Sequence, residues 1–385
     1  MSNQGAHFVA IYSLPHPDFF SQSGGVGGHV SHAIGDVQGL RKSSCKVVAV
    51  IPEGAPLPFR RECYKVIEVP RRNRRFSWNN DLLGCINKIN KDLSIDFIYM
   101  RYSAGFSPWI RWLKKKNSAN TPLILEVNSL LTQHNLLAYL LDRAVLKAAN
   151  CIVTISNKQA DFIRQIGEDS IADKIYIMPN AVDCSRFKNL VGILPSIAKT
   201  QGQASPLRIG YVGILKYNYG LELLLDAYIE IRKTRSDVEI IFCGEGPLYH
   251  DLVCLSEHIP GVVFTGAISF DTVPSYLQTI DIAVYPATRK NNFQSPVKIY
   301  EYMAAGCSII AARMPETVRL LEKNKLGVLY EAGDRQQLIK CLSDLLNNAD
   351  KRNSLGKLAR HHAKEHTWGA RFKDFLLHLK NNNIL

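Results

Sequence analysis

A lysine and a glutamate stand three residues apart in the segment FQSPVKIYEYMAAG, residues 293–306. Ser295 and Pro296 are typical of a helix cap followed by the first helical residue, so Lys298 and Glu301 would share one face near the positive end of a helix. A carboxylate there can accept hydrogen bonds from ribose hydroxyls, and a lysine can neutralise phosphate. A surface ion pair is the alternative interpretation of this spacing.

Two glycine-rich turns could also approach a phosphate. SGGVGGHVSHAIG (23–35) precedes a helical pattern, and a helix N-terminus offers unpaired N–H groups to an anion. The spacing is not a dinucleotide-binding fingerprint, because the third glycine would have to stand at Val30, and it is not a P-loop. FCGEGPLYHDL (242–252) follows a strand pattern in the same way. A purely structural turn is the alternative for both.

Alternating strands and helices must position these segments. Near-continuous apolar runs predict strands that are covered on both faces. The predicted strands are 7–14, 46–51, 97–102, 122–128, 151–156 and 174–180, then 207–214, 238–244, 262–266, 280–287 and 307–313. The predicted helices are 29–42, 136–150, 220–233, 273–280 and 297–306, the last ending at Gly306. Strands that alternate with helices favour parallel sheets.

The pattern breaks between the two halves, where residues 189–207 are rich in Pro, Gly, Ser and Gln. We therefore predict an α/β protein with two Rossmann-like domains that have parallel sheets and face a central cleft. The predicted parts are a domain over 1–190, a linker over 191–206, a domain over 207–365 and a C-terminal helix over 366–385 that packs back on the first domain.

The composition narrows the class of protein. Of 385 residues, 46% are apolar and 21% charged, which argues against disorder. No apolar run is long enough for a transmembrane helix, no signal peptide is evident, and nine scattered cysteines without C-x-x-C suggest reduced thiols. We expect a cytoplasmic protein. Its net charge is +13, with 24 basic and 15 acidic residues in 1–190, which favours an anionic partner.

Six segments together resemble the retaining GT4 family of glycosyltransferases, which have the GT-B fold. They are GGVGGHV (24–30), IMPNAVDCSRF (177–187), IGYVGILKYNYGLELLLDAY (209–228), IFCGEGPL (241–248), SPVKIYEYMAAG (295–306) and HTWGARFKDFL (366–376). They occur in the family's order along most of the chain. The resemblance implies a GT-B fold in which the second domain binds most of a nucleotide-sugar donor.

The resemblance also implies roles for individual residues. Glu301 would bind the donor ribose, while Lys298 and Lys216 would face the diphosphate, and these three form the predicted catalytic group. The predicted donor-binding residues are Gly25, Val26, Gly27, Gly28, Glu245, Gly246, Gln294, Ser295, Pro296 and Val297. His29, Glu126 and Asn128 are the predicted contacts to the acceptor or the transferred sugar.

The chain departs from the family pattern in two places. The glutamate usually found eight residues before Glu301 is Phe293, so we expect Gln294 and backbone amides to supply its contacts. The usual basic residue after Val-Gly is Ile214 and the usual lysine before the helix glycine is Tyr219, so we expect Lys216 to provide the charge in this loop.

The expected reaction is transfer of a sugar from a nucleoside diphosphate to an acceptor hydroxyl, with retention of anomeric configuration. Members of the family are thought to deprotonate the acceptor through the donor phosphate. No D-x-D motif occurs in the chain, and no histidine or cysteine has metal-ligand spacing, so we expect neither a metal nor a cofactor. A sugar-nucleotide epimerase and a non-catalytic partner subunit are the alternatives. Glycan, lipid-linked and small-molecule acceptors all stay open.

Two basic segments could contact a membrane. RRNRRFSWNN (71–80) is followed by SPWIRWLKKKN (107–117), which contains Trp109 and Trp112. Tryptophans at the interface and basic residues on phosphate headgroups would dock the protein on the anionic inner face of a membrane. The alternative is a solvated charged face. Nucleic acid is not an expected partner, because no binding motif accompanies the charge.

Overall fold

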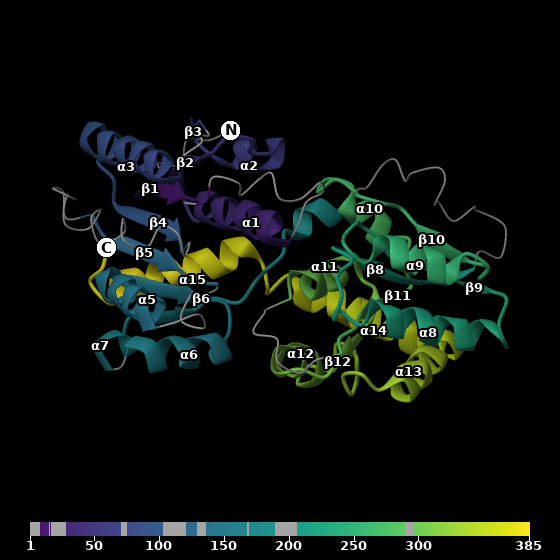
Figure 1. The fold of residues 1–385 in the computed structure, drawn as a ribbon. Helices are drawn as coiled ribbons and strands as arrows, with labels where there is room; N and C mark the ends of the chain where they lie inside the picture. Colours follow the sequence, from purple (N-terminus) through teal and green to yellow (C-terminus); the bar gives the residue numbers. More distant parts are fainter. Residues whose placement is uncertain are drawn as a thin grey trace. The chain divides into compact units, whose positions relative to one another are not determined.

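The chain folds into two compact units in the computed structural model (Figure 1), which describes residues 8–14, 16, 28–70, 75–102, 121–128, 136–167, 169–188, 206–288 and 296–385. The first unit contains His32–Asn180 and Trp368–Leu385 together with the first strand, and the second contains Ala181–Thr367. Residues 28–31 are grouped with the second unit. The predicted linker, 191–206, lies outside the described residues except for its last position.

The first unit is built on a seven-stranded parallel sheet in the order β3-β2-β1-β4-β5-β6-β7. Its strands are β1 (Phe8–Ser13), β2 (Cys45–Pro52), β3 (Lys65–Val69), β4 (Phe97–Arg101), β5 (Leu123–Glu126), β6 (Cys151–Thr154) and β7 (Ile175–Ile177). In the register of the sheet Tyr12 lies beside Ala49 on one side and Tyr99 on the other. The order reverses between β1 and β4, and ligands of such sheets bind outside the carboxyl ends at this switch point.

Helices cover both faces of this sheet because successive strand residues point to opposite faces. The helices are α1 (Gly28–Lys42), α2 (Leu57–Glu62), α3 (Arg75–Asp92), α5 (Leu136–Ala148), α6 (Asn157–Gly167), α7 (Asp169–Ala172) and α15 (Trp368–Asn381). Ile11, Val48 and Ile98 pack in one cluster with residues of α3, α5 and α6. On the opposite face, Tyr99 packs against Phe372 of α15.

The second unit repeats the arrangement with six parallel strands in the order β10-β9-β8-β11-β12-β13. They are β8 (Leu207–Val212), β9 (Val238–Cys243), β10 (Val262–Phe264), β11 (Ile282–Tyr285), β12 (Ser308–Ala312) and β13 (Val328–Tyr330). The order reverses between β8 and β11, so this pair of strands marks the switch point of the second sheet.

Two apolar clusters hold the helices of the second unit on its sheet. One joins the sheet to α8 (Leu221–Arg232), α9 (Tyr249–Ser256) and α13 (Arg335–Asn347). The other joins its opposite face to the 3-10 helix η2 (Cys184–Phe187), α10 (Val273–Leu277), α11 (Val297–Ala305) and α14 (Ala349–Ala363). The short α12 (Pro315–Thr317) and η3 (Val318–Glu322) lead from β12 toward β13. The predicted Rossmann-like α/β class is therefore confirmed.

Some elements differ from the predictions. Residues 181–188 pack with the second unit, whereas the predicted boundary placed them in the first domain. The C-terminal helix begins at Trp368 and belongs to the first unit. In the basic segment 71–80, the structure begins α3 at Arg75 and buries Trp78 completely, with its indole N–H donating to the Val69 carbonyl at 3.2 Å. The strands β3 and β13 and the helices α2, α3, α6, α7, α12, α13 and α14 were not predicted. Among the described helices, none combines the length and apolar character that a membrane span needs.

Gly35 on α1 provides a test of how α15 packs. A Cβ atom at this position would lie 2.1 Å from the Trp368 indole. We expect Gly35→Ala to lower the stability of the chain by about 1–3 kcal/mol, because a packed core does not accommodate an extra carbon without moving its neighbours. The urea midpoint of unfolding, followed by circular dichroism, measures this loss.

Gly84→Ala on α3 is the matched control. Nothing lies within 4 Å of its added Cβ, and the position is exposed. Alanine favours a helix over glycine by about 1 kcal/mol, so this variant should be slightly more stable than the wild type. Equal midpoints for the two variants would contradict the packing of Trp368 on α1.

Candidate functional site

The helix α11 carries two members of a cluster of polar and charged groups in the second unit, Lys298 and Glu301. Val297 is its first helical residue, as in the predicted range 297–306, and the N-cap is Pro296, whereas the cap was predicted at Ser295. The helix ends at Gly306 in the left-handed conformation, with φ 81°, and the N–H groups of Gly306 and Cys307 donate to Met303 and Tyr302 carbonyls. The predicted glycine cap is therefore confirmed.

Lys298 runs from α11 across the backbone of Gly213, which follows β8. A Cβ atom on Gly213 would lie 2.0 Å from Lys298 Cε, at the far end of that side chain, and Gly213 has φ +143°, a conformation that favours glycine. The Lys298 ammonium lies 5.1 Å from the ring centre of Tyr211 and 5.3 Å from that of Tyr219. Two aromatic rings at this distance orient the cation through their quadrupoles.

The loops after β8 and β9 lie directly against one another. The N–H of Gly213 donates to the Cys243 carbonyl and that of Leu215 to the Glu245 carbonyl, each at 2.8 Å. A Cβ on Gly244 would lie 2.1 Å from the Gly213 oxygen, and one on Gly246 would lie 2.3 Å from the Leu215 oxygen. The Gly244-Glu245-Gly246 turn thus continues the backbone pairing of β8 and β9 beyond the carboxyl ends of these two strands. Glu245 is exposed, and Lys216 is exposed in the neighbouring loop.

Glu301 is buried one turn after Lys298 and is paired with an arginine that the sequence analysis did not single out. Arg186 Nη1 lies 3.4 Å from Glu301 Oε1. Burial raises the pKa of the Glu301 carboxyl, while the nearby charges of Arg186 and Lys298 lower it. Arg186 stands in the NAVDCSRF part of a family-like segment, so its motif was visible, but nothing local linked it to Glu301.

A second cluster of charges lies at the carboxyl ends of strands in the first unit. Glu126 ends β5, Arg101 ends β4, and His32 and Asp36 lie one turn apart on α1. His32 Nε2 lies 2.9 Å from Glu126 Oε1 and 3.3 Å from Asp36 Oδ1, and Arg101 Nε lies 3.6 Å from Glu126 Oε1. The predicted residue Asn128 donates from Nδ2 to Glu126 Oε1.

The geometry favours the imidazolium form of His32. Its Nδ1 lies 2.5 Å from Asn180 Oδ1, so both ring nitrogens face acceptor oxygens. Burial alone lowers the pKa of the imidazole, but the carboxylates of Asp36 and Glu126 outweigh it and raise the pKa to about 10. Burial raises the pKa of Asp36, while His32 and Arg101 hold the pKa of Glu126 far below its ordinary range despite burial.

His32, Asp36 and Glu126 are also the described residues that come closest to a metal-ligand set, with donor atoms within 4.8 Å of one another. A ligating histidine must be neutral, whereas this ring lies between two carboxylates as a cation. Arg101 and His32 are the cations that face the Asp36 and Glu126 carboxyl groups, so cationic side chains already stand where a metal ion would have to bind. We therefore interpret the cluster as a buried ion network.

Several predicted site residues lie outside the described part of the chain. They are Gly25, Val26, Gly27, Gln294 and Ser295; Phe293 and the segment 107–117 also lie outside it. Gly28 is the first residue of α1 and His29 the second, so the Gly28 N–H is one of the amides that have no acceptor within that helix.

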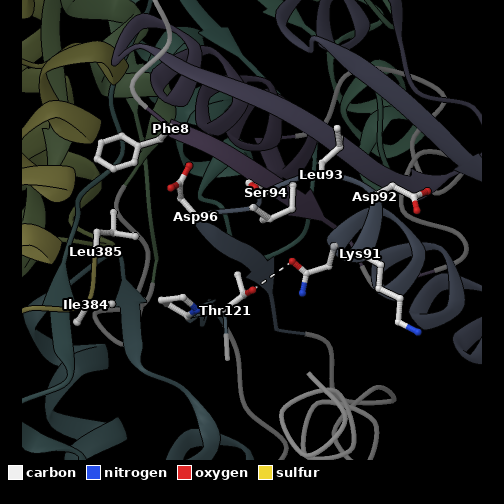
Figure 2. A pocket seen from close by; sticks show the side chains of 12 residues that line it. Phe8, Lys91, Asp92, Leu93, Ser94, Asp96, Thr121, Ile384 and Leu385 are labelled. Carbon is white, nitrogen blue, oxygen red and sulfur yellow. Dashed lines mark hydrogen bonds between the residues drawn. The ribbon is translucent and has the colours of Figure 1, made fainter. Parts of the chain in front are cut away.

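A pocket among the described residues lies at the edge of the first sheet opposite to the candidate site residues. It has a volume of about 580 Å³ and is lined by residues such as Phe8, Asp96, Thr121 and Leu385 (Figure 2). Phe8 begins β1, and Asp96 and Thr121 precede β4 and β5, so the pocket lies at the amino ends of the strands. The candidate site residues instead follow the carboxyl ends.

Comparisons with known proteins match both halves of the chain. The family model "Glycosyltransferase Family 4" covers residues 26–186, and "Glycosyl transferases group 1" covers residues 206–348. The chain belongs to the GT4-type glycosyltransferases. The predicted resemblance is confirmed, and the two models divide the chain near the predicted linker.

Curated GT4-type relatives match part of the chain. The Arabidopsis thaliana sulfoquinovosyl transferase SQD2 is 28% identical over 167 residues, or 43% of this chain. A GDP-mannose-dependent alpha-mannosyltransferase of Corynebacterium glutamicum is 24% identical over 170 residues, or 44% of this chain. The matched regions span 31% and 38% of these two relatives' own lengths.

Solved structures match the whole fold of this GT4-type chain. HepE of Anabaena, in complex with UDP-glucose, has a TM-score of 0.72 at 17% identity and covers 98% of this chain and 100% of its own. Sucrose-phosphate synthase of Thermosynechococcus elongatus has a TM-score of 0.73 at 16% identity and covers 97% of this chain and 99% of its own. The fold is GT-B, as predicted.

We expect the stabilisation from His32 to depend on pH. The pKa of its imidazole rises from 6.5 to about 10 on folding. The stabilisation is therefore complete below pH 6.5 and is lost as the pH rises through 10. In urea unfolding, the stability difference between the wild type and His32→Gln should shrink over this range.

His258→Gln is the control, because His258 is exposed on the second unit. It should unfold like the wild type at every pH. If the gap between wild type and His32→Gln stayed constant or widened with pH, the buried imidazolium would be ruled out.

Proposed function

We propose that this GT4-type chain transfers a sugar from a nucleoside diphosphate to an acceptor hydroxyl with retention of anomeric configuration. The observation that carries the proposal is the placement of Lys298 and Glu301 one turn apart on α11, beside the switch point of the second sheet, with the Lys298 side chain over Gly213. The likeness to HepE, solved with UDP-glucose, supports a nucleotide-sugar donor.

Lys298 and Glu301 would act on different parts of the donor. The leaving group is a nucleoside diphosphate, whose charge grows as the glycosidic bond breaks, and a preoriented cation stabilises that charge. The rings of Tyr211 and Tyr219 orient Lys298. Tyr219, which stands where the family usually has a lysine, thus contributes to the position of Lys298. Glu301 would accept hydrogen bonds from ribose hydroxyls, and Lys216 would add charge from the exposed loop. We propose that no metal is required.

The ion network of the first unit would hold the acceptor or the transferred sugar. Glu126 Oε2 and Asn128 Oδ1 are buried and have no hydrogen-bond partner among the described residues. Unpaired buried oxygens favour a hydroxyl donor from a ligand. His32 and Arg101 would hold Glu126 as a carboxylate for that purpose.

The acceptor is proposed to belong to glycan or glycolipid biosynthesis. SQD2 and an alpha-monoglucosyldiacylglycerol synthase of Streptococcus pneumoniae, 21% identical over 164 residues, are both among the relatives. Leu136, Leu137 and Leu140 expose 74%, 66% and 51% of their surface at the start of α5. Exposed leucines on a basic half of the chain support docking on an anionic lipid surface.

Lys298→Ala should lower kcat with nucleoside diphosphate sugars by about 100-fold or more, because the leaving diphosphate loses its preoriented cation. Lys323→Ala, which removes an exposed lysine after η3, should leave kcat unchanged. Transfer is measured as release of nucleoside diphosphate with and without acceptors. Wild-type activity in Lys298→Ala would remove this lysine from the site, and conversion of donor to an isomer or no reaction at all would favour the epimerase or the partner subunit.

Lipid docking can be tested by sedimentation with liposomes. We expect the chain to bind phosphatidylglycerol vesicles and not phosphatidylcholine vesicles, and the double variant Leu137→Ser, Leu140→Ser to bind more weakly. Leu255→Ser removes a leucine of similar exposure, 59%, from α9 of the second unit and serves as the control. Equal binding to both kinds of vesicle, or unchanged binding of the double variant, would exclude docking through the surface that contains Leu137 and Leu140.

A further inference from the structure

We propose that Arg186 is a positioning residue that keeps Glu301 ionised and aligned for the donor ribose. The inference rests on the proposed function, since it assumes that Glu301 receives the ribose. It assigns a role to the segment around η2. The family model covers this segment as far as residue 186, but the proposed mechanism gives it no part. The evidence is the set of contacts that Arg186 makes inside the second unit.

The turn that carries Arg186 is held at both ends. Asp183 caps η2 by accepting from Ser185 N at 3.1 Å and from Ser185 Oγ at 2.7 Å. Phe187 is buried in the apolar cluster that also contains α11. Arg360 of α14 donates to the Phe187 carbonyl at 3.3 Å. The backbone at residue 186 is therefore fixed against the helix that bears Glu301.

The guanidinium of Arg186 has three partners of different kinds. Its central carbon lies 3.5 Å from the ring centre of Phe270, its Nη2 donates to the Phe270 carbonyl, and its Nη1 lies 3.4 Å from Glu301 Oε1. Stacking and the carbonyl bond already hold the group in place. The contact with Glu301 engages one carboxylate oxygen, which leaves Oε2 to accept from a ribose hydroxyl.

The charges around this pair explain why the arginine matters. Burial raises the pKa of Glu301, and Arg186 and Lys298 are the cations that oppose this effect. Asp183 and the exposed Asp271 also act on Arg186 itself, whose pKa burial lowers. Without Arg186, only Lys298 would oppose burial, and the carboxyl would take up a proton at a higher pH. A protonated Glu301 is a poorer acceptor for ribose hydroxyls.

The test is the pH dependence of nucleotide binding. Isothermal titration with UDP, GDP, ADP and dTDP between pH 5.5 and 8.5 identifies the nucleotide that the wild type binds and gives the reference pH profile against which each variant is compared. In Arg186→Met, which keeps an unbranched side chain against Phe270, affinity for the same nucleotide should fall by up to about tenfold for each pH unit below the new pKa. Arg186→Lys should restore most of the wild-type profile.

Kinetics separate this role from a purely structural one. Arg186→Met should raise KM for the donor at low pH while kcat changes by less than about twofold, because uniform binding is lost and the reacting atoms are untouched. Arg313→Met is the matched control, since Arg313 Nη1 lies 2.8 Å from Glu322 Oε1. Arg313 follows β12 and Glu322 ends η3, so neither residue belongs to α11 or η2. It should keep the wild-type pH profile.

The possible outcomes distinguish the inference from the function on which it rests. If the wild type binds a nucleotide and Arg186→Met has the same pH profile, Arg186 does not set the state of Glu301 and the inference is overturned alone. If the wild type binds none of the four nucleotides, the proposed function fails first. If Arg186→Met does not fold, Phe270→Leu, which removes the stacking ring, should show a smaller shift in the same direction, and an unchanged profile there would overturn the inference.

Discussion

The close approach of two loops to one lysine is the constraint on which the proposed donor site depends. Gly213 and Gly244 meet backbone to backbone, where a methyl group on Gly244 would collide with the Gly213 oxygen, and Lys298 crosses Gly213. This contact brings the end of β8, the end of β9 and the start of α11 to one place. The site is therefore set by backbone geometry first, and the side chains that bear charge are aligned by it.

Each candidate site contains a buried glutamate. Burial favours the neutral carboxyl group, and nearby cationic side chains favour the carboxylate. Glu126 has His32 and Arg101, and Glu301 has Arg186 and Lys298. Leaving a buried carboxylate without such partners is costly, so the partners stabilise the fold while keeping the carboxylate ready to accept hydroxyl groups. In each unit the pairing lies past the carboxyl ends of the strands, where parallel sheets leave their ligand-binding edge.

The sequence was a good guide to elements with strong local patterns. Continuous apolar runs predicted eleven of the strands that the two sheets contain, and the spacing of Lys298 and Glu301 predicted their shared helix. The strand β3 was missed because only one of its residues is fully buried, and α14 because it buries only Gly356, Ala359 and Ala363. Arg186 lies 115 residues before Glu301, so no local pattern could reveal their contact, which exists only in the folded chain. The network of His32 and Glu126 was hidden for the same reason.

A crystal structure of the chain with a bound nucleoside diphosphate tests the central claim most directly. We expect the ribose hydroxyls within hydrogen-bond distance of the Glu301 carboxylate and the phosphates beside the Lys298 ammonium, over the loops of Gly213 and Gly246. A nucleotide bound away from α11, for instance in the pocket at the amino ends of the first sheet, would contradict it.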